Sequence, residues 1–115
     1  MELEEIMQKS VELGKSIALS IVYQEFKQSE NDLLHNPEAC KLVEGLQKMK
    51  QELQGKKMAG IEVSKVEQDA MAELEKACLR DRQVLASNEA NSRFQELMEK
   101  MSANIKAGIK SVDQG

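Results

Sequence analysis

The chain has 115 residues, of which 31% are charged and 3% are aromatic, and its formal net charge is −4. A chain of this length forms one domain, which we place over residues 1–115, and leaves no room for separate catalytic and regulatory domains. The acidic balance and the scarcity of aromatic residues argue against a nucleic-acid-binding platform. Because the dominant residue types are strong helix formers, we predict an all-α fold.

The first predicted helix extends from Glu2 to about Leu34. It carries two adjacent rows of apolar side chains at helical spacing, which together form a wide stripe of the kind that faces a core. The first row consists of Ile6, Leu13, Ile17 and Ile21, and the second of Met7, Val11, Ala18, Val22 and Phe26. We expect the polar stretch 28–32 to weaken this helix.

The clearest boundary in the sequence follows His35. Asn36 is a favoured N-cap, Pro37 is favoured at the first helical position, and Glu38 is stabilised by the helix dipole. A second helix therefore begins at Pro37, and it should end near Gly60. Its apolar residues are spaced three and four apart, as in the seam of a coiled coil. They are Ala39, Leu42, Leu46, Met49 and Leu53.

A third helix is predicted to begin after Ser64, because Ser64 and Glu67 have the spacing of a capping box. Its expected inner face consists of Val66, Ala70, Leu74 and Ala77. At Asp81 the sequence permits either a break or a bend within one helix. The last segment repeats the apolar spacing of a helix, and residues 111–115 are expected to fray. Its stripe consists of Phe94, Met98, Met101, Ile105 and Gly108, widened by Leu97 and Ile109.

These segments predict three or four long amphipathic helices in an extended antiparallel bundle with short connections. Stripes of this length cannot all be covered by one chain of 115 residues, and a large uncovered apolar patch usually marks an interface. We therefore predict a homo-oligomer, with a two-fold dimer as the simplest form. The residues expected to pack within or between chains are Leu42, Leu46, Met49, Leu53, Phe94, Met98, Met101 and Ile105.

We expect no catalytic, cofactor or metal site. The single histidine, His35, has no nucleophile motif near it, and no glycine-rich phosphate loop occurs. Cys40 and Cys78 lack CxxC spacing and are most simply reduced, buried small hydrophobic residues. An iron–sulfur cluster usually needs four thiolates, so the alternative of a redox or iron–sulfur sensor requires both cysteines of two subunits.

Localisation and nucleic-acid binding complete the expectations from composition. The N-terminal sequence MELEEIM is acidic where a secretory signal is basic, and no apolar stretch is long enough to span a bilayer. We therefore expect a cytoplasmic protein without membrane insertion. A third hypothesis, direct RNA binding through the face from Lys48 to Lys57, ranks last because acidic residues lie nearby throughout.

Residues 29–60, SENDLLHNPEACKLVEGLQKMKQELQGKKMAG, resemble the YlbF/YmcA family of small helical bacterial proteins. That family typically shows an Asp/Asn-Pro-Glu-Ala turn, a Leu-x-x-(Phe/Leu)-Gln seam, a Gln-Glu-Leu-Gln stretch and Met-x-Gly. Upstream LGKSIALSIVYQEFKQSE resembles the family's first helix, and downstream ANSRFQELMEKMSANI resembles its last. The chain departs from the family pattern over residues 81–88, where members often have Asn-Pro and Tyr-Leu.

This resemblance implies an all-α fold, self-association and no enzymatic activity. The better-known members regulate competence, sporulation and biofilm formation, and they associate with one another and with a membrane-anchored ribonuclease. Some are linked to iron–sulfur clusters in that assembly. The leading hypothesis is therefore a non-enzymatic regulatory adaptor whose partners are its own copy, sister family members and a ribonuclease, without direct nucleic-acid contact.

Overall fold

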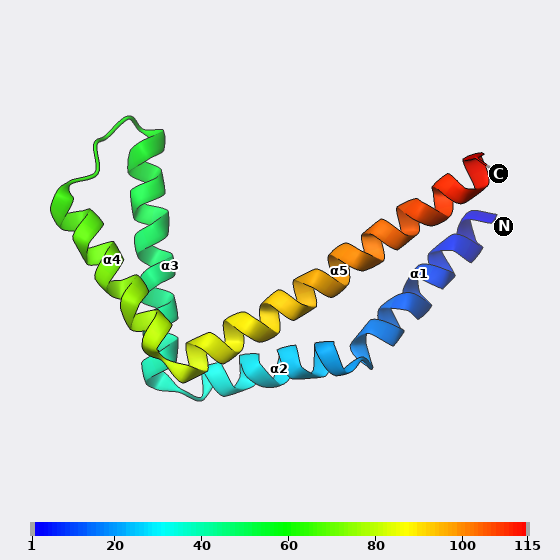
Figure 1. Ribbon diagram of the computed structural model, residues 1–115, viewed down its shortest axis with the longest axis horizontal. Helices are drawn as coiled ribbons and strands as arrows, with labels where there is room; N and C mark the ends of the chain where they lie inside the picture. Colours follow the sequence, from blue (N-terminus) through cyan, green and yellow to red (C-terminus); the bar gives the residue numbers. More distant parts are fainter. Residues whose placement is uncertain (1, 115) are drawn as a thin grey trace. The chain divides into compact units, whose positions relative to one another are not determined.

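The computed structural model describes residues 2–114, and within this range it contains five α-helices and no β-strand (Figure 1). The all-α prediction is therefore confirmed, but the helix count exceeds the predicted three or four. The helices are α1 (Glu2–Ala18), α2 (Ile21–Leu34), α3 (Pro37–Met58), α4 (Lys65–Arg80) and α5 (Arg82–Gln114). The bundle arrangement and the dimer remain predictions.

By its internal contacts the chain divides into two compact units, which are described separately below. Unit 1 consists of the residues up to Gln28 together with those from Glu89 onward, and unit 2 consists of Ser29–Asn88. Helices α2 and α5 are each divided between the units, with one part in unit 1 and the other in unit 2.

The predicted first helix is broken at Leu19 and Ser20, in unit 1, and not at residues 28–32. The Ser20 hydroxyl donates to the Ile17 carbonyl at 2.6 Å and accepts from the Tyr23 backbone N–H at 3.2 Å. The Gln24 side-chain amide donates to the Ala18 carbonyl at 2.7 Å. These bonds satisfy backbone carbonyl and N–H groups that would pair with each other in an unbroken helix. A serine hydroxyl can replace backbone hydrogen bonds in this way, which allows the helix to break here.

Residues 28–32 remain helical. In unit 2, the carbonyl of Ser29 accepts hydrogen bonds from the Gln83 side-chain amide and the Ser87 hydroxyl, each at 3.4 Å. Ser29 is buried by this contact. Tertiary contacts thus stabilise a stretch whose own sequence is too polar to predict a firm helix.

In unit 1, α1 runs antiparallel to the C-terminal part of α5, so the first turn of α1 lies beside the last turns of α5 (Figure 1). The start of α2 packs against α5 through the rings of Tyr23, Phe26 and Phe94. Arg93 forms ion pairs with Glu25 at 3.3 Å and with Glu89 at 2.6 Å.

In unit 2, α3 begins at Pro37, as predicted. The Asn36 side-chain oxygen accepts from the Ala39 backbone N–H at 3.1 Å. Gly60 has a φ of +74° beyond the end of α3, which confirms its predicted role at the C-terminus. The capping box of Ser64 and Glu67 at the start of α4 is also confirmed.

The core of unit 2 consists of Ala39, Cys78 and Val84, surrounded by partly buried side chains. Helices α3 and α4 pack against each other, with Gly45 of α3 facing Leu74 of α4. The partly buried side chains around the core are Leu33, Leu42, Val43 and Leu46.

The predicted inner face of α4 was partly wrong. Val66 is 78% exposed and Ala70 is exposed, whereas Met71, Leu74 and Cys78 lie on the inner side. The spacing 66, 70 and 74 advances by four residues per step, which exceeds 3.6 residues per turn. The row therefore drifts around the helix, and its first members point to solvent.

Asp81 separates α4 from α5, which settles the choice that the sequence left open. The carboxylate of Asp81 accepts from the Val84 backbone N–H at 2.9 Å, so Asp81 acts as the N-cap of α5. Helix α5 continues to Gln114 and includes residues 111–114 of the tail that we expected to fray, and Gly115 lies outside the described residues. Across residues 2–114, no helix combines the length and the apolar character that a membrane span requires.

Candidate protein-binding surface

Helix α1 (Glu2–Ala18) has no buried residue, although it carries two apolar rows. Leu13 and Ile17 of its first row line a groove of about 670 Å³ against α5, whereas Ile6 of the same row is exposed. The side chains that line this groove in unit 1 are Leu13, Ser16, Ile17, Ser20, Leu97, Lys100, Met101, Asn104 and Ile105. The surface of the groove is predominantly apolar, and its polar lining residues are two serines, one lysine and one asparagine.

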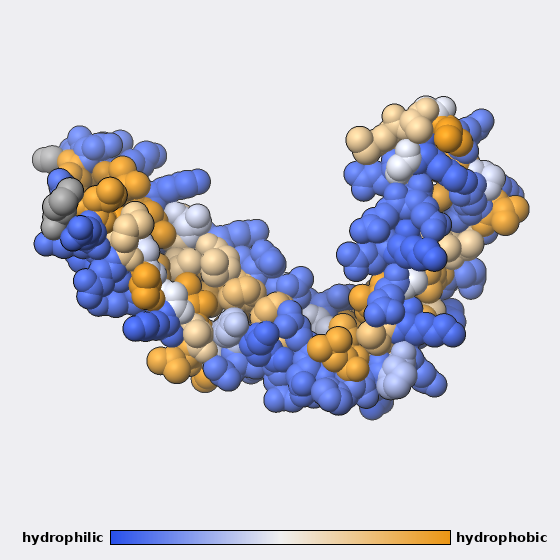
Figure 2. Space-filling model, turned by 180° about the vertical axis from the view of Figure 1, so that it is seen from behind, coloured by the Kyte–Doolittle hydropathy of each residue, from blue (hydrophilic) through white to orange (hydrophobic). Residues whose placement is uncertain are grey.

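Apolar residues from both rows of α1 and from the C-terminal part of α5 are open to solvent. Figure 2 shows hydrophobic side chains gathered over this part of unit 1. We use the name unit-1 apolar surface for the exposed residues Leu3, Ile6, Met7, Val11 and Leu13 of α1 and Met98, Ile105, Ile109 and Val112 of α5. Two paired helices cover each other only in part, so even Leu13 and Ile105, which line the groove between them, stay exposed.

The eight residues that we predicted to pack within or between chains fall into two groups. In unit 1, Phe94 belongs to the aromatic cluster, whereas Met98 and Ile105 lie on the unit-1 apolar surface. Met101 and Ile105 line the groove against α1.

The other four predicted residues lie on α3 in unit 2. Leu42 and Leu46 pack against the buried core, and Met49 is half-buried. Leu53 lines a second groove between α3 and α4. This half of the prediction therefore describes mainly packing within the chain.

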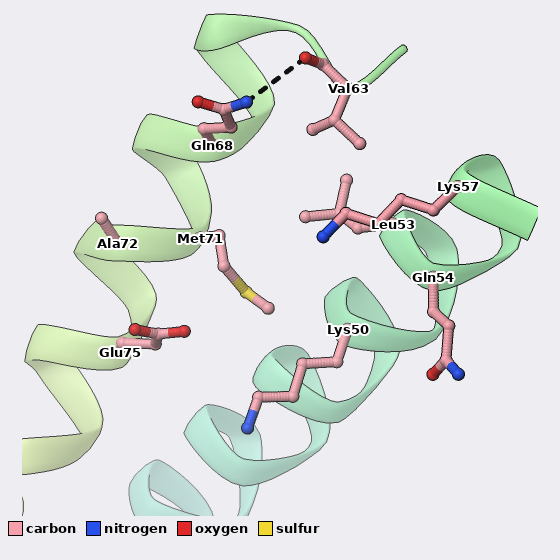
Figure 3. A pocket seen from close by; sticks show the side chains of 9 residues that line it. All are labelled: Lys50, Leu53, Gln54, Lys57, Val63, Gln68, Met71, Ala72 and Glu75. Carbon is pink, nitrogen blue, oxygen red and sulfur yellow. Dashed lines mark hydrogen bonds between the residues drawn. The ribbon is translucent and has the colours of Figure 1, made fainter. Parts of the chain in front are cut away.

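The α3–α4 groove, which was not predicted from the sequence, has a volume of about 590 Å³ (Figure 3). Its lining combines apolar side chains with charged ones from both helices. The lining residues are Lys50, Leu53, Gln54, Lys57, Val63, Gln68, Met71, Ala72 and Glu75. The sequence contains one signal that could have indicated this groove: Lys50 and Lys57 lie seven residues apart, on either side of Leu53.

A hydrogen bond and an ion pair lie near the connecting segment between α3 and α4, at one end of this groove. The Gln68 side-chain amide donates to the Val63 carbonyl at 3.5 Å. The Lys56 ammonium pairs with the Glu67 carboxylate at 2.5 Å. Hydrogen bonds from Lys56 and Ser64 hold the pKa of Glu67 below its ordinary value.

The two cysteines lie in different environments. Burial raises the pKa of the Cys78 thiol, which lies in the unit 2 core and donates to the Leu42 carbonyl at 3.7 Å. A hydrogen bond to Glu44 raises the pKa of Cys40, which is half-buried. Both shifts disfavour the thiolate, which is the form that binds metals. Within residues 2–114, no three His, Cys, Asp or Glu side chains gather as a metal site would require.

The sequence and the fold both match known proteins. A family model described as control of competence regulator ComK, YlbF/YmcA, matches residues 6–110. A solved structure with the same fold is that of Bacillus subtilis RicA, determined in complex with RicF. It is 14% identical, with a TM-score of 0.77 over 93% of this chain and 95% of that chain. No protein with a curated description matches the sequence.

Proposed function

This chain belongs to the YlbF/YmcA family, and we propose that it is a non-enzymatic regulatory adaptor that associates with a second copy and with a larger protein partner. The observation that carries the proposal is the unit-1 apolar surface, where nine large apolar side chains of α1 and α5 are exposed. Exposed patches of this kind mark interaction sites on proteins.

A second copy of the chain is the occupant that fits this surface best. Covering apolar area stabilises a complex by roughly 25 cal/mol per Å², and two pairs of helices can bury their stripes as a four-helix bundle. The charges agree with such an arrangement. Acidic residues open α1 at Glu2, Glu4 and Glu5, and Lys106 and Lys110 lie near the end of α5. A two-fold axis along the helices would place each acidic end beside the partner's basic end.

The known structure of a similar protein supports an assembly with related chains. Bacillus subtilis RicA was solved in complex with RicF, and its fold matches this chain over nearly its full length. We propose that this chain likewise binds sister family members. By resemblance to the family, the larger partner is a ribonuclease whose RNA processing the adaptor modulates from the cytoplasm.

The iron–sulfur alternative gains no support from the cysteine environments. Metal binding requires deprotonated thiols, and the pKa of both Cys40 and Cys78 is raised. We therefore put forward the adaptor function alone.

Self-association is tested by placing charges on the unit-1 apolar surface. Met7→Glu with Ile109→Glu should convert a dimer into a monomer in sedimentation velocity, because two unpaired carboxylates would be desolvated in the interface. The matched control is Val66→Glu with Leu79→Glu, which places the same charges on exposed apolar positions of unit 2. A monomeric wild-type chain, or a dimer that survives the unit 1 variant, would refute this interface.

The regulatory role is tested in the organism that makes the protein. The tagged chain is recovered gently under anaerobic conditions, and co-purifying proteins are quantified. Stoichiometric recovery of a ribonuclease or of sister family members is the expected result. Recovery of the dimer alone would contradict the adaptor function while leaving the fold assignment intact.

A further inference from the structure

We propose that the α3–α4 groove of unit 2 is a docking site for an acidic amphipathic helix of a partner protein. The groove shares no residue with the unit-1 apolar surface, so its occupation does not compete for the same side chains. The inference goes beyond the self-association proposed above and names the kind of segment that the adaptor would bind.

The floor of the groove is apolar and adaptable. Leu53 from α3, Met71 from α4 and Val63 from the connecting segment converge on it (Figure 3). Each of the three is only half-buried within the chain. Methionine is flexible and polarisable, and it suits surfaces that accept the apolar side chains of a docking helix. A helix laid in such a groove presents side chains at i, i+3 or i+4 and i+7.

The groove is held in shape before any partner arrives. Further along the α3–α4 interface, Gly45 faces Leu74, and a Cβ atom added to the glycine would lie in ordinary contact, 3.6 Å from a leucine methyl. Near the connecting segment, the Lys56–Glu67 ion pair joins the two helices. A preformed groove lowers the entropic cost of binding.

The rim of the groove carries a charge pattern that selects the partner. Lys50 and Lys57 lie seven residues apart on α3, which is two helical turns or about 10 Å. In the described part of the chain, neither lysine has an ion-pair partner, whereas Lys56 between them is paired with Glu67. Glu75 lines the opposite wall on α4.

This arrangement complements a helix with carboxylates two turns apart along the side that faces α3. Opposite charges at an interface steer association and set the orientation of the partner. The acidic excess must lie on the partner, because the rim of this chain supplies the two lysines.

The test uses the full-length chain and two labelled synthetic peptides of about 20 residues, long enough to form a stable helix. Both carry leucine at every third or fourth position, and one has flanking glutamates where the other has lysines. Fluorescence anisotropy should show binding of the acidic peptide, with about tenfold weaker binding or none for the basic one. Binding of the acidic peptide should also weaken as salt is raised.

Charge reversal on the rim identifies the site. Lys50→Glu with Lys57→Glu should weaken binding of the acidic peptide by about tenfold or more. The matched control, Lys41→Glu with Lys48→Glu, has the same spacing and charge change on α3, but neither residue lines this groove, and affinity should stay within about twofold. Circular dichroism establishes that both variants are folded, which is expected because all four lysines are exposed.

The proposal is overturned if the acidic peptide does not bind, if both peptides bind equally, or if the two double variants behave alike. Sedimentation of the same variants reports on the dimer separately. An intact dimer with lost peptide binding supports the docking site and leaves the unit-1 interface in place. Retained peptide binding at the reversed rim contradicts the docking site, whatever the state of the dimer.

Discussion

The ring of Phe94 in α5 stacks on the ring of Phe26 in α2, with centroids 4.8 Å apart and 20° between their planes. Tyr23 meets Phe94 at its edge, with centroids 5.5 Å apart. One tyrosine and two phenylalanines are all the aromatic residues of the chain, and their three rings form a single cluster. This cluster joins α2 to α5 within unit 1, where few other large side chains are covered.

Removal of the Phe94 ring should therefore destabilise the protein strongly. Phe94→Ala is expected to lower the free energy of unfolding by about 2–3 kcal/mol, somewhat below the value for a fully buried phenylalanine. Urea denaturation followed by circular dichroism measures the change. Met98→Ala, one turn further along α5 at an exposed position, should cost less than about 1 kcal/mol. Equal losses in the two variants would mean that the cluster does not stabilise unit 1.

The hydroxyl of Ser20 should stabilise the break between α1 and α2. Ser20→Ala removes the acceptor for the Tyr23 backbone N–H and should cost about 1 kcal/mol, as for other helix N-caps. Ser16→Ala is the matched control, because the Ser16 hydroxyl only donates to the Glu12 carbonyl within α1. Thermal unfolding should show a clear decrease in Tm for the first variant and almost none for the second. The reverse order would exclude Ser20 as a cap.

Two glycines near the end of α3 should respond in opposite directions to the same substitution. Gly55→Ala is expected to raise the free energy of unfolding by about 0.5–1 kcal/mol, because it lies within the helix and an added Cβ would meet nothing within 4 Å. Gly60→Ala should lower it by about 1 kcal/mol, because a φ of +74° is strained for alanine. Chemical denaturation of both variants measures the two signs, and a shared sign would contradict the left-handed turn at Gly60.

The contribution of Glu67 to stability should depend on pH. Its pKa is lowered in the folded chain, first by the Lys56 hydrogen bond and then by that of Ser64. A lowered folded pKa stabilises the protein above the ordinary value of 4.5, and this stabilisation is lost as the pH falls through the folded value. Glu67→Gln should therefore be less stable than the wild type at pH 7 and should approach it near pH 3.

The measurement for Glu67 is urea denaturation of both proteins at the two pH values. The control is Glu62→Gln, which removes the same charge from an exposed position in the adjoining connection. A difference between wild type and Glu67→Gln that stays constant between the two pH values would show that the ion pair is not the cause.

Features that depend on neighbouring residues were predictable from the sequence. Asn36 and Ser64 cap their helices as expected, because a cap needs only a side-chain oxygen and an N–H two or three residues further on. Ser20 also caps a helix, but the apolar rows that continue on both sides of it concealed the break. Our prediction of the inner face of α4 was partly wrong, because apolar residues four apart indicate that a helix has an apolar face but do not define the centre of that face.

The candidate sites were predictable to different degrees. Met98 and Ile105 of the unit-1 apolar surface were recognised from their helical spacing, but that spacing does not reveal whether another helix covers them. The α3–α4 groove depends on side chains from two helices and the segment between them, from Lys50 to Glu75. No single periodic pattern describes such a set.

The sequence by itself determined the helical class, the start of α3 and α4 and the family to which the chain belongs. These properties arise from helix propensity, local hydrogen bonds and motif order, all of which act over a few residues. Only the tertiary structure decided that the carbonyl of Ser29 accepts hydrogen bonds from Gln83 and Ser87. It also decided that Leu46 packs against the core of unit 2 while Met7 stays exposed. The reason is physical: burial depends on which surfaces meet in space, and an apolar stripe has the same pattern whether or not another helix covers it.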